Sequence, residues 1–282
     1  MGYIQNFSSL PPHPLLQESV QQYYVMEYMP EGSDTGGQCI LPSGNPQVLY
    51  VWGSDLYTII NGATKRLTGG IAFGQSLKTL KICFASAAQV YGIVFTPQGF
   101  TKLISKGING LFETMATTIE CEIGHAFKNL RSWFDSLNTP PSLQVFKETS
   151  DAFLLRRAAD SLSQPTWLPP VIGKMWATCG CVKIDRLCDI ANISDRQLEM
   201  KFTEWVGCKP KQYKRIVRFV KFLEKCRTTT CDDELSTVAI DCGFYDQAHL
   251  CREVKIITGG SPTSYLKKSV RVFNWGFWSE PI

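Results

Sequence analysis

The first third of the chain, up to about Thr96, alternates short hydrophobic runs with turn signals. The runs are QQYYVMEY, QVLYVW, LYTII, KICFA and VYGIVF, all rich in β-branched and aromatic residues. The segments PSGNP, NGATK and LTGG separate them, and their glycine, proline and asparagine residues favour turns. About six short strands with no helix between them are typical of a β-barrel or sandwich.

After Pro97 the hydrophobic spacing becomes helical. Ile119–Leu137 and Ser142–Leu162 carry apolar residues at helical spacing, and Pro140–Pro141 interrupts them. A second break runs from Gln164 to Pro170 and predicts a short linker, beyond which the pattern is helical.

These patterns predict an α+β protein. Residues 1–164 are expected to form a β-barrel followed by helices, and residues 165–270 an all-α domain. Residues 271–282 are left as a C-terminal tail.

The all-α part contains an internal repeat with the spacing L-x3-[F/V]-x4-G-x2-P-x2-Y. The first copy consists of Leu198, Phe202, Gly207, Pro210 and Tyr213, and the second of Leu250, Val254, Gly259, Pro262 and Tyr265. Because the spacing is identical at five positions, we expect the two copies to form the same supersecondary unit.

Each copy also carries signals for the beginning and the end of a helix. Ser194 with Gln197 three residues later is a capping box, and Asp246 is the N-cap of the second copy. Gly207 and Gly259 provide the left-handed residue with which helices often end.

A shorter helical segment precedes each capped helix, Ile184–Ala191 in the first copy and Glu234–Asp241 in the second. Asn192–Ile193 and Gly243–Phe244 form the turns, so each copy has the order of a helix-turn-helix unit. The basic segment Pro210–Arg227 would connect them as a long helix, whose charges could contact phosphates or simply face solvent.

In a helix-turn-helix unit the second helix enters the major groove, with its exposed N-terminal residues at the base edges. These candidate DNA-binding residues are Asp195, Arg196, Glu199 and Met200 in the first copy and Gln247, Ala248, His249 and Arg252 in the second. Arg and Gln suit bidentate base contacts, and Glu can accept from cytosine. The same residues could instead be ordinary solvent-facing positions of a helical bundle.

The charge distribution favours a polyanionic partner for the helical part. Between Val171 and Arg271 there are 18 Lys and Arg against 12 Asp and Glu, a net charge of +6. The remaining 11 basic and 13 acidic residues give −2. A soluble basic surface with no partner would show the same excess.

The cysteines indicate a reduced, cytoplasmic protein. Eleven are present, but Cys179 and Cys181 form the closest pair and no second pair or histidine cluster accompanies them. We expect no metal and no cofactor. The N-terminus has no pattern of a signal peptide, and the most apolar stretch, Ile82–Phe95, is too short to span a membrane.

The passages IANISDRQLEMKFTEWVGCKPKQY and VAIDCGFYDQAHLCREVKIITGGSPTSYL, within Lys183–Lys268, resemble the DNA-binding domain of AraC/XylS-type bacterial regulators. The resemblance implies two helix-turn-helix subdomains joined by a long helix, and transcriptional control through double-stranded DNA. Position 200 is commonly Arg in this family and is Met here, and position 254 is usually Phe and is Val here. We therefore expect the second copy to make more of the base-specific contacts.

The N-terminal passages VQQYYVMEY, ILPSGNPQVLYVWG, GIAFGQ and VYGIVFTPQGF resemble a sensor-like domain that precedes this DNA-binding domain in some family members. The resemblance implies a cupin-like β-barrel that binds a small effector or mediates homodimerisation. RNA polymerase is a further candidate partner. Four aromatic residues could line a pocket in the barrel or form its core, namely Tyr50, Trp52, Tyr57 and Phe73.

Two alternatives to a DNA-binding regulator stay open. An enzyme would need a catalytic motif, and the sequence contains no G-x-S-x-G elbow, P-loop or G-x-G-x-x-G. A metal-dependent cupin would need clustered ligands, but the barrel region holds only His13. We therefore expect no enzyme and no catalytic residue. The second alternative is a sensor or anti-regulator that keeps the fold without binding DNA, and Met200 favours it slightly.

Overall fold

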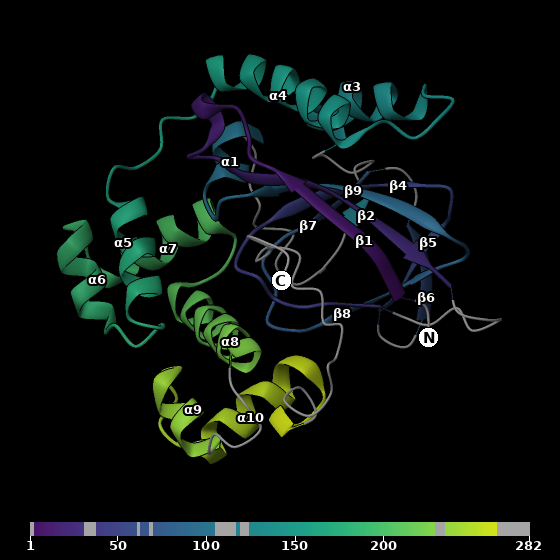
Figure 1. Ribbon diagram of the computed structural model, residues 1–282. Helices are drawn as coiled ribbons and strands as arrows, with labels where there is room; N and C mark the ends of the chain where they lie inside the picture. Colours follow the sequence, from purple (N-terminus) through teal and green to yellow (C-terminus); the bar gives the residue numbers. More distant parts are fainter. Residues whose placement is uncertain are drawn as a thin grey trace.

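Figure 1 shows a computed structural model of the chain. The structure describes residues 3–30, 38–60, 63–67, 70–104, 117–118, 124–228 and 235–263. The predicted tail 271–282 and the repeat position Tyr265 lie outside these ranges.

Two antiparallel sheets form the N-terminal domain. The six-stranded sheet has the order β1 (Tyr3–Leu10), β2 (Val20–Met29), β9 (Ala88–Phe95), β4 (Gln47–Trp52), β7 (Ile71–Phe73) and β10 (Thr117–Thr118). The four-stranded sheet has the order β3 (Gln38–Ile40), β8 (Leu80–Phe84), β5 (Leu56–Ile60) and β6 (Ala63–Leu67). The predicted cupin-like barrel is confirmed.

The inner strands β2, β9 and β4 of the six-stranded sheet are buried on both faces, which explains their continuous apolar runs. Successive residues of a strand point to opposite faces. Tyr24 therefore lies in the apolar cluster between the two sheets, whereas its neighbour Tyr23 lies in a second cluster beneath the helices. Of the four aromatic residues considered for a pocket, Tyr50 and Phe73 are buried, and Trp52 and Tyr57 are half-buried.

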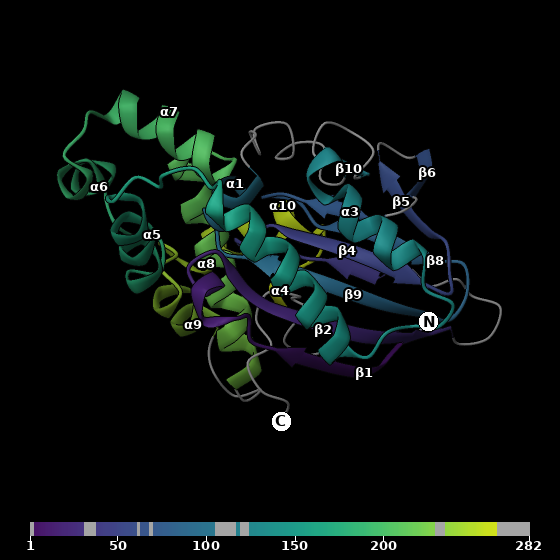
Figure 2. The ribbon, with the colours of Figure 1, turned by 90° about the horizontal axis from the view of Figure 1, so that it is seen from above.

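Helices cover the outer face of the six-stranded sheet (Figures 1 and 2). They are η1 (Pro14–Leu16), α1 (Gly99–Ile104), α3 (Gly124–Asp135) and α4 (Leu143–Ala159). The side chain of Ser142 accepts a hydrogen bond from the Val145 amide and caps α4, where the sequence predicted a helix start. The other predicted helix, from Ile119, is described from Gly124, because residues 119–123 lie outside the described ranges.

Some local predictions were wrong. The segment NGATK was expected to be a turn, but Ala63–Lys65 belong to β6. Strands β1, β3, β7 and β10 were not predicted, because three of them are only two or three residues long and β1 is an edge strand with a polar sequence. Pro169 and Pro170 were expected in the linker but lie in the first turn of α5 (Leu168–Ala177), where a missing amide proton costs no helical hydrogen bond.

The C-terminal domain is all helical, as predicted. After α5 come α6 (Ile184–Ala191), α7 (Asp195–Val206), α8 (Pro210–Thr228), α9 (Leu235–Asp241) and α10 (Gln247–Thr258). We call α6–α7 the first unit and α9–α10 the second unit. In Figure 1, α8 runs between the two units. Its apolar residues pack on both sides, Tyr213 and Ile216 against the first unit and Phe219 and Phe222 against the second.

A barrel loop, Leu41–Pro46, is buried against the helical domain. Gly44, at the tip of this loop, has a φ of +80°, and its carbonyl accepts a hydrogen bond from the Tyr213 hydroxyl at 3.3 Å. The same hydroxyl accepts from Trp176 Nε1 at 3.1 Å. These contacts join the barrel to α5 and α8.

Two further contacts connect the barrel to the C-terminal end of each capped helix. The Thr101 hydroxyl of α1 donates to the Trp205 carbonyl of α7 at 2.8 Å. The backbone amide and hydroxyl of Thr79 donate to the Ile257 carbonyl of α10 at 2.8 and 2.9 Å. The N-terminal domain therefore contacts both units directly.

We predict that Gly44→Ala lowers the free energy of unfolding by about 1–3 kcal/mol, because the left-handed backbone at φ +80° disfavours a side chain. The added Cβ would also lie 3.3 Å from both Trp176 and Tyr213. Thermal unfolding measures the change. Gly173→Ala is the control: this exposed position of α5 has nothing within 4 Å of its Cβ, so a gain of about 0.5–1 kcal/mol is expected. Equal effects of the two substitutions would contradict the role of Gly44.

Candidate nucleic-acid interface

The helix boundaries of the first unit follow the predicted capping signals. The Ser194 hydroxyl accepts from the Gln197 amide, and Gln197 Oε1 accepts from the Ser194 amide at 3.2 Å, which completes the capping box. Asn192, in the turn, adopts a left-handed φ of +52°, and Gly207 ends α7 at φ +90°. The first helix-turn-helix prediction is confirmed in detail.

The apolar stripe of α7 is buried, and this places its predicted DNA-facing residues at the surface. Asp195 and Arg196 are exposed in the first turn, and Met200 is 61% exposed. The Glu199 carboxylate pairs with Lys209 Nζ at 2.7 Å, with both side chains at the surface. Glu199 therefore already has a cationic partner, whereas Met200 offers only an apolar contact.

Two side chains form hydrogen bonds with backbone amides at the N-terminus of α10, Asp246 just before the helix and His249 in its first turn. Asp246 accepts from the His249 amide at 2.6 Å, and His249 Nδ1 accepts from the Tyr245 amide at 3.2 Å. The imidazole also packs edge-on against Phe244, with ring centroids 5.5 Å apart. Since Nδ1 accepts a hydrogen bond, the proton of the neutral ring is assigned to Nε2. His249 is thus half-buried and caps its own helix, which leaves Nε2 for an outside contact.

The other predicted residues of the second unit are freely presented. Gln247, Ala248 and Arg252 are exposed on α10, opposite its buried stripe. Tyr245, directly before the N-cap, is 88% exposed, and the sequence analysis missed it. The signal in the sequence was that this aromatic residue follows the turn but does not belong to the apolar stripe of α10. An exposed aromatic ring at this end of a recognition helix suits contact with a base or sugar.

Two basic side chains of the connecting helix α8 form ion pairs with the second unit. Arg215 Nε and an Nη donate to the two carboxylate oxygens of Glu253 on α10, at 2.8 and 3.2 Å. Lys225 pairs with Asp241 of α9 at 2.9 Å. Burial, followed by the nearby Arg218, lowers the pKa of Lys214. Arg215 and Lys225 therefore already have carboxylate partners within the protein.

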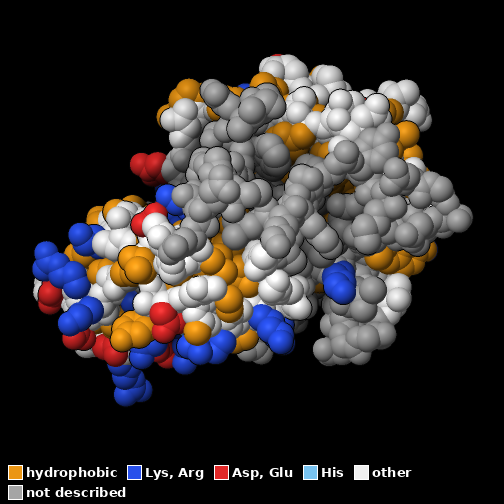
Figure 3. Space-filling view, turned by 60° about the horizontal axis from the view of Figure 1, so that its bottom comes forward, with side chains coloured by type: hydrophobic (Ala, Val, Ile, Leu, Met, Phe, Trp, Pro, Cys, Tyr) orange, Lys and Arg blue, Asp and Glu red, His pale blue; other side chains and the backbone are white. Residues whose placement is uncertain are grey.

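Lysine and arginine side chains nevertheless gather over the helical domain on the face shown in Figure 3. Acidic and apolar side chains are interspersed with them. The surface matches the charge asymmetry read from the sequence and is suited to a polyanion.

Eight cysteines of the described residues, among them Cys226 and Cys242, are free thiols. Burial raises the pKa of Cys226 and Cys242 to about 12, so both keep their protons at neutral pH. In the same ranges, no group of three or more His, Cys, Asp or Glu could hold a metal ion. No helix among the described residues has the length and hydropathy needed to cross a bilayer.

Comparisons with known proteins agree with this geometry. Residues 187–268 match the family model of a helix-turn-helix domain, and residues 8–116 match a domain of unknown function (DUF6597). A structure of ToxT from Vibrio cholerae is similar over 88% of this chain and 98% of its own, with 12% identity and a TM-score of 0.50. An unsaturated fatty acid-bound ToxT structure covers 88% and 95%, with 11% identity and a TM-score of 0.50. A search of curated proteins gave no match.

We predict that Glu253→Gln lowers the free energy of unfolding by about 1–2 kcal/mol, because it leaves the half-buried Arg215 guanidinium without its carboxylate. Chemical denaturation measures the loss. Asp189→Asn is the control, since the Arg186–Asp189 pair is exposed on both sides and should contribute less than about 0.5 kcal/mol. If both variants lose the same amount, the α8–α10 pair is not a specific support of the second unit.

Proposed function

We propose that this chain, an AraC-type helix-turn-helix protein with a cupin-like N-terminal domain, regulates transcription by reading DNA mainly through its second unit. The observation that carries this proposal is the N-terminal turn of α10. There Gln247, Ala248 and Arg252 are exposed beside a helix start that Asp246 and His249 cap. Gln and Arg side chains at such a position suit bidentate contacts to adenine and guanine.

The rigidity of α10 supports its assignment as the main reading helix. Its flank is held by the two hydrogen bonds between Arg215 and Glu253, and its C-terminal end by Thr79. A reading side chain loses less conformational freedom on binding when the helix that carries it is already fixed. In this proposal Arg252 contacts guanine, Gln247 contacts adenine, and Tyr245 contacts the neighbouring backbone or base.

The first unit contributes less to sequence recognition in this proposal. Arg196 is the exposed cation of α7 that faces the bases. Glu199 must release its ion pair with Lys209 before it can accept a hydrogen bond from cytosine. Met200 contacts a thymine methyl group through its apolar side chain. Asp195 lies at the helix start and disfavours a nearby phosphate. In this proposal the two units, joined by one connecting helix, therefore contribute unequally to base-specific contacts.

We further propose that the N-terminal domain controls the placement of the two units. Thr101 and Thr79 of this domain donate hydrogen bonds to backbone carbonyls of α7 and α10. A shift of the barrel would therefore be transmitted to both helices. A small effector or homodimerisation would provide such a shift, and the bound fatty acid of one ToxT structure supports an effector for this fold. Contact with RNA polymerase stays a prediction.

We expect Arg252→Ala to weaken binding to the cognate site by about 1–3 kcal/mol, while binding to random DNA changes little. Gel shifts with genomic fragments at about 50 mM and about 200 mM salt measure both affinities. Lys128→Ala is the control, because it removes the same charge from an exposed position on α3 of the barrel domain.

Two results would contradict the proposal. An equal loss of affinity of Arg252→Ala for specific and random DNA would show that Arg252 contacts only a phosphate. If the unaltered protein binds no fragment even at low salt, the chain is a sensor or anti-regulator that keeps the fold.

A second prediction tests the first unit. Met200→Arg should tighten binding by about 1 kcal/mol, because a guanidinium at this exposed position of α7 gains a phosphate or guanine contact. Met200→Gln, which is polar but uncharged, is the comparison and should gain less. Unchanged affinity of both variants would show that α7 does not approach the DNA.

A further inference from the structure

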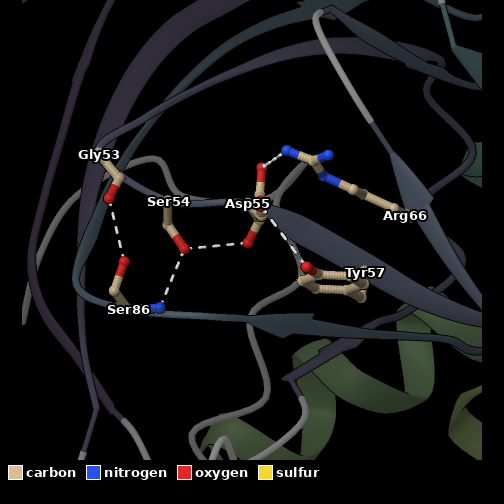
Figure 4. A network of polar contacts seen from close by, with 6 residues as sticks. All are labelled: Gly53, Ser54, Asp55, Tyr57, Arg66 and Ser86. Carbon is tan, nitrogen blue, oxygen red and sulfur yellow. Dashed lines mark hydrogen bonds and ion pairs between the residues drawn. The ribbon is translucent and has the colours of Figure 1, made fainter.

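Charged and polar groups at the barrel end are paired within the chain, as Figure 4 shows. Asp55 Oδ1 accepts a hydrogen bond from Arg66 at 2.6 Å. The Ser54 hydroxyl accepts from the Ser86 amide at 3.0 Å. These groups give no reason to expect a partner from outside the chain, in contrast to three cations of α8.

One face of α8 carries three basic side chains, Lys211, Lys214 and Arg218, which we call the cation row. Their spacing of three and four residues places them on the same side of the helix. Lys211 is exposed, whereas Lys214 and Arg218 are half-buried.

The cation row differs from the other lysines of α8 in its lack of a counter-charge. Towards the C-terminal end of the helix, Lys221 pairs with Glu224 at 2.7 Å and Lys225 with Asp241 at 2.9 Å. No carboxylate in the described part of the chain pairs with a member of the row. The protein therefore neutralises the C-terminal cations of this helix and leaves the first three without an anion.

The missing counter-charge is costly for the two half-buried members of the row. Arg218 Nε is buried and has no hydrogen-bond partner among the residues that the structure describes. Burial and, after it, the charge of Arg218 lower the pKa of Lys214. Like charges in partly buried positions destabilise a fold when no anion neutralises them. The row is therefore suited to an anion that comes from outside the chain.

The cation row adjoins the place where the two helix-turn-helix units meet. Gly180, in the loop between α5 and α6, has a φ of +71°, and a Cβ there would overlap the Lys214 carbonyl oxygen and lie 3.3 Å from Arg218 Cγ. The same loop contacts the second unit, because Cys181 Sγ donates to the Gly243 carbonyl at 3.4 Å. Gly243 belongs to the turn before α10, so the row lies beside the contact between the start of the first unit and the turn of the second.

We propose that the cation row binds the DNA backbone that passes between the two major-groove segments read by α7 and α10. Recognition helices in successive major-groove faces lie about 34 Å apart, so a sugar-phosphate backbone crosses the surface between them. Phosphate oxygens supply the anion that the row lacks, and such contacts position a duplex without reading its sequence. The inference rests on the proposed DNA-binding function and adds a third, sequence-independent contact to the two reading helices.

The shape of the row favours a nucleic-acid backbone over a single small anion. The seven residues from Lys211 to Arg218 cover about 10 Å of helix, so the three cations are spread along a line. One DNA strand carries a phosphate about every 3.4 Å along the duplex axis, so about three phosphates can face a row of this length. Each cation can therefore contact a phosphate of its own.

The test measures how the binding of the purified full chain depends on salt. The probe is a labelled random-sequence duplex of about 25 base pairs, long enough for two major-groove segments. Fluorescence anisotropy gives its dissociation constant between about 50 mM and about 200 mM salt. Lys214→Gln should lower the slope of log K against log salt by about 1, and the triple variant Lys211→Gln, Lys214→Gln and Arg218→Gln by about 3.

Two further variants and a stability measurement separate a phosphate contact from a structural role. Lys225→Gln is the matched control, because it removes the same charge from the same helix where Asp241 already neutralises it, and its slope should not change. Lys214→Arg keeps the charge and should keep the slope. The Tm of Lys214→Gln without DNA should be unchanged or higher, since the substitution removes an unpaired, partly buried charge.

The outcome for the row is separable from the outcome for the reading helices. Suppose that Arg252→Ala loses affinity for the cognate fragment while the triple variant keeps its slope, or loses no more slope than Lys225→Gln. The cation row then does not contact DNA, and the proposed function stands. If the unaltered chain binds no duplex at low salt, both proposals fail.

Discussion

The buried hydroxyl of Tyr213 joins the barrel to two helices of the C-terminal domain at once. It is fully buried, accepts a hydrogen bond from the Trp176 indole and donates one to the Gly44 carbonyl. Burial raises the pKa of this phenol, so it keeps its proton and remains a donor at neutral pH. Because a buried polar group costs free energy when unpaired, α5, α8 and the barrel loop are held in one arrangement.

The position of α8 follows from this anchor and in turn sets both helix-turn-helix units. Its apolar side chains divide between two cores, with Ile216 in the first and Phe219 in the second. Its cations reach outward to the second unit, as in the Arg215–Glu253 pair. This helix therefore supports both units, and two of its cations pair within the protein.

The barrel is built around two separate apolar clusters on opposite faces of one sheet. This division explains why the N-terminal domain needs helices α3 and α4: without them, the aromatic face that carries Tyr50 and Tyr91 would meet water.

The sequence by itself determined the local features of the fold. Capping boxes, helix stops and apolar stripes act within one or two turns, so Ser194, Asp246 and Gly207 located α7 and α10 almost to the residue. The strands with long apolar runs were found for the same reason. Short strands such as β7 were missed, because their pairing energy comes from neighbours distant in sequence. Only the tertiary structure decided that Tyr213 contacts Gly44, that Glu253 neutralises Arg215, and that Tyr50 keeps an unpaired hydroxyl. Each of these features depends on which residues the folded chain brings within a few ångströms of each other. The periodicity of the sequence does not show which distant residues will meet.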